Sequence, residues 1–203
     1  MPLILARRAP PFALLLLLLA AAFPAMAAEM PLPGQLLVAS PSMGDPRFDH
    51  AVILILRHDK SGAFGVVINR PLGARPLKSL LAATGDAKDS HVTGTLRVFA
   101  GGPVEPERGF VVHTPDYRRA GTLVVDGEVA MTANRDILVD IGHHRGPHKS
   151  FLAFGYAGWA AGQLEAEIAD HSWYTAAGDA QLIFDLPRAG LWDEAMARRL
   201  REL

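Results

Sequence analysis

The stretch Phe151–Trp173 constrains the fold more than any other part of the chain. It begins as an apolar run of strand length, passes through three closely spaced glycines, and ends in a polar segment rich in helix formers. This order predicts a buried strand, then a glycine loop that carries Trp159, then a helix over Gln163–Ala169. A strand that leads directly into a helix is typical of chains that pack helices against a sheet.

Short apolar runs separated by turn-forming residues recur along the chain. The runs expected to form strands are Gln35–Ala39, Ala51–Leu56, Ala63–Asn69, Leu96–Ala100, Gly109–His113, Gly121–Val125, Val129–Thr132, Ser150–Phe154 and Gln181–Phe184. Turns at His58–Gly62 and Asp126-Gly127 predict hairpins, and the continuous apolar character of Ala51–Leu56 predicts burial on both faces. Helices are expected over Pro76–Thr84, Arg135–Ile141 and Leu191–Leu203. The pattern favours an α+β fold, with a mixed, largely antiparallel sheet surrounded by helices.

Length and charge limit the possible classes of function. A chain of 203 residues, half of them apolar, is expected to form one domain with a substantial core. Its formal net charge of −1 gives no global field that attracts nucleic acid or acidic membranes. The absence of cysteine excludes disulfides, thiolate metal sites and cysteine nucleophiles. Within the domain, Gly85–Thr95 is expected to be a polar linker.

The N-terminal segment has the three parts of a secretory signal. Arg7-Arg8 forms a positive n-region, Phe12–Ala22 is a Leu/Ala-rich h-region, and Ala25–Ala27 matches the small-x-small cleavage pattern. The h-region is short for a membrane-spanning helix. The favoured prediction is a signal peptide over residues 1–27, cleaved near Ala27, and a single periplasmic or secreted domain over residues 28–203. Two alternatives stay open, namely an uncleaved anchor and a cytoplasmic protein whose translation starts at Met30.

No short motif identifies a reaction. Gly155, Gly158 and Gly162 stand where a phosphate could meet a helix N-terminus, but their spacing matches neither a Walker loop nor a Rossmann fingerprint. The favoured interpretation is that these glycines provide backbone freedom and close packing. The sequence has no G-x-S-x-G elbow, and no helix-turn-helix, RNA-stacking motif or basic stripe predicts nucleic-acid binding.

Polar side chains gather on the helix that follows these glycines. Gln163 and Glu167 are four residues apart and therefore share a face. Glu167 could act as an acid or base, or bind a metal together with His171 if the helix extended that far. A solvated helix face is the favoured interpretation. The histidines of Gly142–His148 are likewise expected to lie in an exposed loop rather than in a metal site.

Five segments in the same order resemble the YqgE/AlgH family of bacterial proteins. They are Leu36–Phe48, Gly62–Gly73, Phe99–His113, Met131–Leu138 and Phe154–Ile168, and Trp173, Leu182–Phe184 and Trp192 continue the match. The resemblance implies a small barrel-like, bifurcated sheet wrapped by helices, and it implies no cofactor and no catalytic residue. One branch of the family is described as a transcriptional regulator of alginate synthesis.

The favoured function is that of a non-enzymatic binding or regulatory protein, with a small molecule or a protein as its partner. No cofactor or metal is expected, and nucleic acid is not an expected partner. A hydrolase or small-ligand enzyme that uses strand-end polar residues is one alternative, and a transcriptional regulator is another. The candidate ligand-binding residues are His58, Asn69, Arg70, Gly101, Gly102, Arg108, His113, Trp159, Gln163 and Glu167. The place to look for a polar pocket is between Gly101–Val104 and Gly155–Gln163.

Overall fold

The computed structural model describes residues 32–83 and 91–199. The chain divides into two units, Met1–Met30 and Pro31–Leu203, and every described residue belongs to the second. The predicted signal peptide, most of the predicted linker and the end of the predicted C-terminal helix lie outside the described residues. Within these two ranges, no helix combines the length and apolar character that crossing a bilayer requires.

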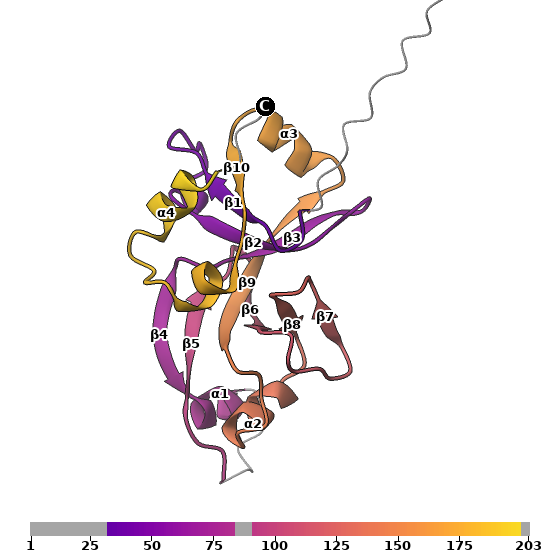
Figure 1. Ribbon diagram of the computed structural model, residues 1–203, viewed down its shortest axis with the longest axis vertical. Helices are drawn as coiled ribbons and strands as arrows, with labels where there is room; N and C mark the ends of the chain where they lie inside the picture. The colour runs from indigo at the N-terminus through magenta and orange to yellow at the C-terminus, as the bar shows by residue number, and fades with distance from the viewer. Residues whose placement is uncertain (1–31, 84–90, 200–203) are drawn as a thin grey trace, which may run out of the picture. The chain divides into compact units, whose positions relative to one another are not determined.

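The described strands form one ten-stranded sheet in the order β10-β1-β2-β3-β9-β6-β8-β7, from which β4 and β5 branch (Figure 1). The strands are β1 Leu36–Ala39, β2 Val52–Asp59, β3 Gly62–Val67, β4 Pro71–Pro76, β5 Thr95–Ala100, β6 Val104–His113, β7 Thr122–Val124, β8 Ala130–Thr132, β9 Ser150–Ala160 and β10 Trp173–Ala176. All neighbouring strands pair antiparallel except β5 and β9. The predicted mixed, largely antiparallel sheet is therefore confirmed.

Helices surround this sheet, as the sequence predicted (Figure 1). The α-helices are α1 Leu77–Ala83, α2 Asp136–Gly142, α3 Gln163–Ala169 and α4 Leu191–Ala197, and two short helices of other types are η1 Pro46–Phe48 and η2 Gln181–Asp185. The side chain of Asn134 accepts a hydrogen bond from the backbone N–H of Asp136 at 2.9 Å, which helps to fix the start of α2.

The sheet divides at β9. The edge of β9 away from β6 pairs first with β5, at residues 152–154, and then with β3, at residues 157–160. Gly155 lies between the two pairings in the left-handed conformation, with φ of 73°. A Cβ atom there would lie 2.3 Å from the carbonyl oxygen of Gly102, so only glycine allows this approach. The bifurcated sheet implied by the family resemblance is present, and Gly155 is at its branch point.

The glycine loop predicted around Trp159 is wrong. The strand β9 continues to Ala160, and Trp159 pairs with Ala63 of β3. The glycines looked like turn residues, but Gly158 lies within the ladder, opposite Phe64. Backbone pairing with β3 therefore keeps this segment extended, and the turn is reduced to Ala161-Gly162 before α3.

The last predicted strand, Gln181–Phe184, is also wrong. It is the π-helix η2, whose Leu182, Ile183 and Phe184 side chains are buried in the core. Two arginines bind its carbonyl oxygens: Arg188 donates to Leu182 O at 3.1 Å and Ile183 O at 2.6 Å, and Arg97 donates to Phe184 O at 2.7 Å. Side-chain donors thus take the place of a neighbouring strand.

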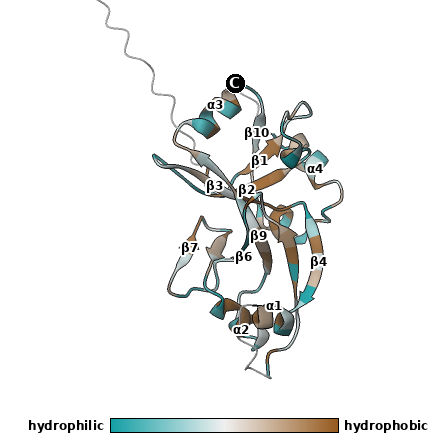
Figure 2. Ribbon diagram, turned by 180° about the vertical axis from the view of Figure 1, so that it is seen from behind, coloured by the Kyte–Doolittle hydropathy of each residue, from teal (hydrophilic) through white to brown (hydrophobic). Residues whose placement is uncertain are grey.

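The core lies on both faces of β1 and β2, where Figure 2 shows hydrophobic residues concentrated. Alternate residues such as Leu36 and Leu54 pack towards η2 and α4, whereas Leu37 and Ile53 pack towards Trp173 and α3. The predicted burial of β2 on both faces is therefore confirmed for its first five residues. A third cluster holds α1 and α2 against β5, β6 and β9.

Candidate functional site

Three of the predicted site residues are engaged in contacts within the fold, two of them with the backbone. The Asn69 amide accepts from the backbone N–H of Val52 at 2.9 Å and donates to the carbonyl of His50 at 2.8 Å. Arg70 donates to the carbonyl oxygens of Arg47 and Asp49. His58 Nε2 lies 2.7 Å from Glu165 Oε1 at the surface of α3. Side chains engaged in this way fix loops and helix positions rather than face a common cavity.

His113, Gly101 and Gly102 are likewise taken up by packing. The His113 side chain is fully buried, and its ring nitrogens lie 2.8 Å from Thr114 O and 2.9 Å from Thr132 Oγ1. Burial lowers the pKa of His113, which keeps its imidazole neutral. Cβ atoms at Gly101 and Gly102 would collide with the backbone of β9 at 2.5 Å and 2.1 Å.

Trp159, Gln163 and Glu167 converge as the sequence suggested. Oε2 of Glu167 accepts the indole N–H groups of Trp159 and Trp173, both at 2.8 Å. Its Oε1 accepts from the Gln163 amide at 2.8 Å. The expectation of a merely solvated face is therefore wrong for Glu167. His171 follows the helix in the left-handed conformation and is not a helical partner of Glu167.

These three residues border a cavity of about 360 Å³ at the predicted place. Its walls include Pro103 and Val104 on one side and residues 157–159 of β9 on another. Asp45 and Arg47, which form an ion pair with a contact of 2.7 Å, lie at its border. Trp159 and Trp173 have exposed fractions of only 7% and 2%, so the cavity reaches little of either indole.

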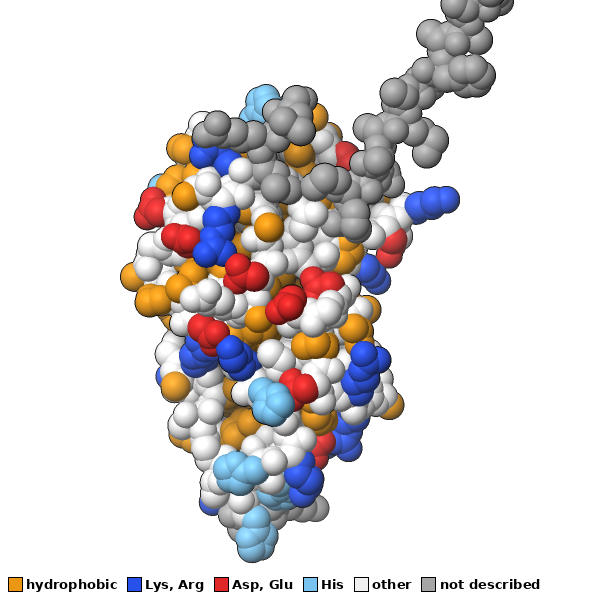
Figure 3. Space-filling view, in the orientation of Figure 1, with side chains coloured by type: hydrophobic (Ala, Val, Ile, Leu, Met, Phe, Trp, Pro, Cys, Tyr) orange, Lys and Arg blue, Asp and Glu red, His pale blue; other side chains and the backbone are white. Residues whose placement is uncertain are grey.

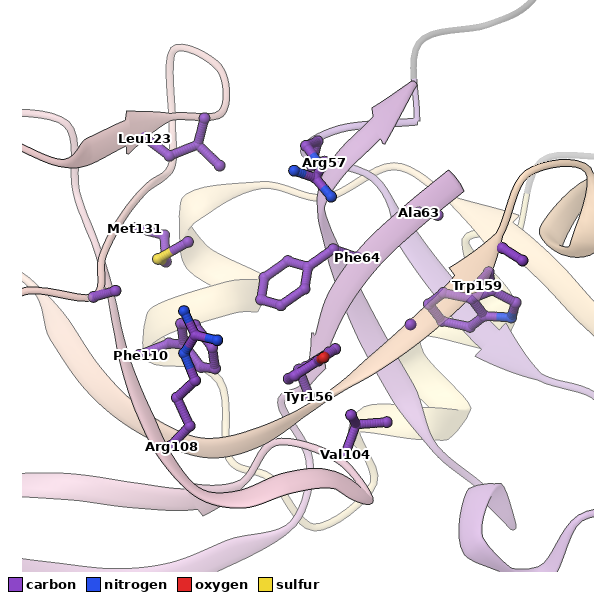
Figure 4. Close-up of a pocket in the computed structure, with 13 residues that line it drawn as sticks. Arg57, Ala63, Phe64, Val104, Arg108, Phe110, Leu123, Met131, Tyr156 and Trp159 are labelled. Atoms are coloured by element: carbon purple, nitrogen blue, oxygen red, sulfur yellow. The ribbon is translucent and has the colours of Figure 1, made fainter. Parts of the chain in front are cut away.

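Trp159 also lines a larger cavity, of about 600 Å³, which Figure 4 shows in close-up. Residues from β2, β3, β6, β7, β8 and β9 surround it. They are Arg57, Ala63, Phe64, Val104, Arg108, Phe110, Leu123, Met131, Ala133, Tyr156, Gly158, Trp159 and Ala160. Of the residues predicted from the sequence, Arg108 and Trp159 belong to this group.

Three aromatic rings form the centre of this larger cavity. The Phe64 ring centroid lies 4.9 Å from that of Tyr156 and 5.3 Å from that of Phe110. Phe64 pairs across the sheet with Arg57 of β2 on one side and with Gly158 of β9 on the other. Gly158 has no side chain, which leaves room for the Tyr156 ring, because a Cβ atom at Gly158 would lie 3.2 Å from Tyr156 Cε2.

Two arginines flank the aromatic rings. In Figure 4 the Phe64 ring lies between the guanidinium ends of Arg57 and Arg108. A register shift in β2 between Ile55 and Arg57 places Arg57 opposite Phe64. The guanidinium carbon of Arg108 lies 5.3 Å from the Phe110 ring centroid, within the range of a cation–π contact. Both side chains are more than half exposed.

Each arginine also has a carboxylate neighbour outside the cavity. Arg57 Nε lies 3.4 Å from Asp59 Oδ2, and Arg108 Nη1 donates to Glu105 Oε2 at 3.0 Å. The Tyr156 hydroxyl donates to the other Glu105 oxygen at 3.2 Å. The hydrogen bond from Arg108 lowers the pKa of Glu105, while burial and then the Glu105 hydrogen bond raise the pKa of Tyr156.

Sequence reasoning missed the aromatic group. Phe64, Phe110 and Tyr156 occur in apolar strands, where large side chains normally indicate core. Phe110 is in fact buried, whereas Phe64 and Tyr156 are partly buried. Their arrangement around the cavity depends on how β3 pairs with β2 and β9, which is a property of the assembled sheet. One signal was available, since a glycine inside a strand can mark a close approach by a ligand.

The AlgH-like family model matches residues 36–202 of the chain. A UPF0301 protein of Novosphingobium aromaticivorans is 42% identical over 165 residues, which cover 81% of this chain and 88% of the relative. A UPF0301 protein of Methylococcus capsulatus is 44% identical over 159 residues, covering 78% and 84%.

Solved structures agree with this match. The solution structure of AlgH from Pseudomonas aeruginosa is similar with a TM-score of 0.72 and 39% identity, covering 85% of this chain and 90% of AlgH. A crystal structure of protein DIP2367 from Corynebacterium diphtheriae shares the fold, with a TM-score of 0.65 and 23% identity over 87% of this chain and 91% of that protein. The chain therefore belongs to the AlgH-like family.

Proposed function

We propose that this protein is a non-enzymatic binding protein whose 600 Å³ cavity takes a small planar anion. The observation that carries the proposal is the pair of arginines, Arg57 and Arg108, on either side of a partly buried aromatic ring, Phe64, that lines the cavity. The volume is within the range of small-molecule sites.

The chemistry of the lining selects the class of ligand. A planar ring can stack or pack edge-on against Phe64 and Tyr156, as aromatic rings do with each other. A carboxylate or phosphate on that ring can receive forked hydrogen bonds from a guanidinium. Arg57 pairs with Asp59 and Arg108 with Glu105, and both ion pairs are exposed. They compete little with a bound ligand for the arginines, because an ion pair in water contributes at most about 1 kcal/mol.

The same lining supports binding rather than catalysis. Among the described residues that line the cavity there is no serine, threonine, histidine, aspartate or glutamate, so that, apart from the arginines, the Tyr156 hydroxyl is the one group of this lining that could exchange a proton. The hydrolase alternative requires His58, Asn69, Arg70, Arg108 and His113 in one pocket with Glu167. Arg108 borders the larger cavity and Glu167 the smaller one, while the other four line neither.

Ligand titrations test the proposal directly. Benzoate, indole-3-carboxylate and adenosine monophosphate serve as probes, with tryptophan fluorescence and calorimetry as readouts. Arg57→Gln and Arg108→Gln are each expected to weaken binding about tenfold, the effect of one lost charge-assisted hydrogen bond. Arg75→Gln, an exposed position on β4 outside the cavity, is the matched control. Absence of binding by every probe, or equal binding by all variants, would contradict the proposal.

The proposal includes export of the mature domain. Its support is the sequence of an n-region, then an h-region, then a small-x-small site that ends at Ala27. N-terminal sequencing of protein from fractionated cells is expected to find Ala28 or Glu29 as the first residue, in the periplasmic fraction. Protein that begins at Met1 or Met30 in the cytosolic fraction would overturn this part.

A direct role in transcription is the second candidate, and its support is the regulatory role described for one branch of the family. It requires salt-sensitive binding to duplex DNA. Failure to bind duplex DNA at low salt would leave ligand binding as the basis of any regulatory effect.

A further inference from the structure

A third hollow, of about 530 Å³, lies at the other end of β9 from Trp159. It is bordered by the starts of β5 and β9 and by the loop that follows α2. Its lining residues are Thr95, Leu96, Arg97, Ile141, His144, Gly146, Pro147, His148, Lys149 and Ser150. None of them is acidic, whereas four carry a basic side chain. Figure 3 shows histidines gathered at the end of the domain that carries α1 and α2.

Three permanent cations lie in or beside this hollow. Arg97 and Lys149 line it, and Arg188 binds η2 carbonyls next to the one that Arg97 binds. Burial, and to a smaller extent the charge of Arg97, lowers the pKa of Arg188 to about 10. The carboxylate in contact with them is Asp185, whose Oδ2 lies 2.5 Å from the Lys149 ammonium. A group of cations that outnumbers its carboxylate partners creates a positive potential, which an anion would relieve.

Donors remain for such an anion after the internal contacts are counted. Arg97 donates to Phe184 O from one nitrogen, Nη2, of a guanidinium that carries five N–H groups. The Lys149 ammonium has three N–H groups, and one faces Asp185. His148 contacts Asp116 through Nδ1 at 3.0 Å, which leaves its Nε2 for another partner.

The loop between α2 and β9 is built to bring these groups together. Gly146 lies so close to α2 that a Cβ atom there would be 2.5 Å from the Ile141 side chain. His144 adopts the left-handed conformation, with φ of 59°, which is unusual for a residue with a side chain. Backbone bonds from Arg145 to Asp140 at 2.8 Å and from His148 to the Asp116 side chain at 3.0 Å hold the turn.

We propose that this hollow is a second binding site, and that it takes a small molecule with two or three linked phosphate groups. Basic side chains from β5 and from the loop after α2 approach it, together with the Thr95 and Ser150 hydroxyls, which suits an anion with many oxygen atoms. A single carboxylate offers two oxygens and would leave most of these donors unused. The hollow has no aromatic side chain other than histidine, so it differs in chemistry from the Phe64 cavity.

The test is calorimetric titration of the full domain with tripolyphosphate at low salt. Lys149→Gln and His144→Gln are each expected to weaken binding about tenfold, and Lys149→Arg is expected to preserve it. Both positions are exposed, which limits the effect on folding. Arg97 is not substituted, because it also binds η2. Arg57→Gln is the matched control, since it removes a cation from the Phe64 cavity.

Three results would overturn the proposal. The first is no binding of tripolyphosphate by the wild-type protein. The second is equal binding by wild type, Lys149→Gln and His144→Gln. The third is loss of binding in Arg57→Gln alone, which would assign the phosphate to the Phe64 cavity. If duplex DNA bound in a way that depends on Lys149, and tripolyphosphate did not compete with it, the ligand of this hollow would be a nucleic acid rather than a small molecule.

Discussion

Glu167 Oε2 accepts the indole N–H of Trp159 at 2.8 Å, which links the helix α3 to the end of β9. The same oxygen accepts the indole N–H of Trp173 on β10, and the two indole centroids lie 5.9 Å apart in an edge-to-face arrangement. One carboxylate thus ties together a helix and two strands that are not neighbours in the sheet. Because Trp159 borders both cavities near α3, this link also fixes the wall between them.

Replacement of Glu167 by alanine is expected to lower the free energy of unfolding by about 3 kcal/mol. The reason is that two nearly buried indole N–H groups lose their acceptor, and each unsatisfied buried donor costs about 1–3 kcal/mol. Glu167→Gln is expected to cost less, because an amide oxygen can still accept from the indoles. Urea denaturation followed by tryptophan fluorescence measures both changes.

Glu165→Ala is the matched control on the same helix. Glu165 is half exposed and pairs with His58, so its loss is expected to cost no more than about 1 kcal/mol. Equal destabilisation by Glu165→Ala and Glu167→Ala would show that the indole contacts contribute nothing beyond an ordinary surface pair.

Gly155→Ala is expected to destabilise the domain by more than about 2 kcal/mol. A left-handed residue with a Cβ costs about 1–2 kcal/mol, and here the Cβ would also collide with Gly102 O. Gly121→Ala separates the two effects, because Gly121 has φ of 83° and no atom within 4 Å of the added Cβ. Chemical denaturation of both variants gives the comparison. If the two substitutions cost the same, close approach at the branch point of the sheet is not what requires glycine.

Much of the sheet could be predicted because its strands have clear sequence patterns. The β2–β3 and β7–β8 hairpins combine apolar runs with turn residues such as Asp126-Gly127, and both were predicted. The edge strand β4 was not predicted, because Pro71, Gly73 and Pro76 indicate an interruption. Proline is compatible with β4 because, among the described strands, β5 is the one that pairs with it.

The errors at Trp159 and at Gln181–Phe184 share a physical cause. In both segments the local sequence pattern predicted one conformation, and contacts with a distant part of the chain stabilise another. Gly158 stays extended because β3 pairs with it, and Leu182–Phe184 coils because arginines bind its carbonyls. The aromatic cavity could not be predicted for the same reason, since it needs side chains from six strands. By contrast, Gln163 and Glu167 could be paired from helical spacing alone.

Arg188→Met is expected to lower the free energy of unfolding by about 2–3 kcal/mol. The substitution removes the guanidinium that lies over the Phe99 ring and leaves the carbonyls of Leu182 and Ile183 without their charged donor. Arg199→Met is the control, because Arg199 bonds an exposed helix-end carbonyl and stacks near Tyr174. Thermal and urea denaturation measure the difference. A loss in Arg199→Met as large as in Arg188→Met would argue against a special role for the η2 carbonyls.

His113 is expected to make the domain less stable in mild acid. Burial lowers its pKa in the folded protein, against smaller opposing effects of Thr114 O and Asp116, whereas the unfolded chain has the ordinary histidine value of about 6.5. Below that value His113 binds a proton in the unfolded state but not in the folded state, so the free energy of unfolding falls as the pH falls. The loss ends once the pH is below the folded pKa, because both states are then protonated. Its slope is at most about 1.4 kcal/mol per pH unit.

Urea denaturation of wild type and His113→Gln between roughly pH 5 and pH 8 measures this slope. Other carboxylates and histidines titrate in both proteins, so the difference between the two curves isolates His113. Wild type is expected to lose more stability than the variant below about pH 6.5, and the two curves are expected to run parallel above it. Nitrogen NMR of the His113 ring adds a direct readout, with protonation of the ring expected at a lower pH in the folded protein than in the unfolded chain. Parallel curves throughout, or a ring that protonates at the same pH in the folded and unfolded protein, would mean that burial does not lower the pKa of His113.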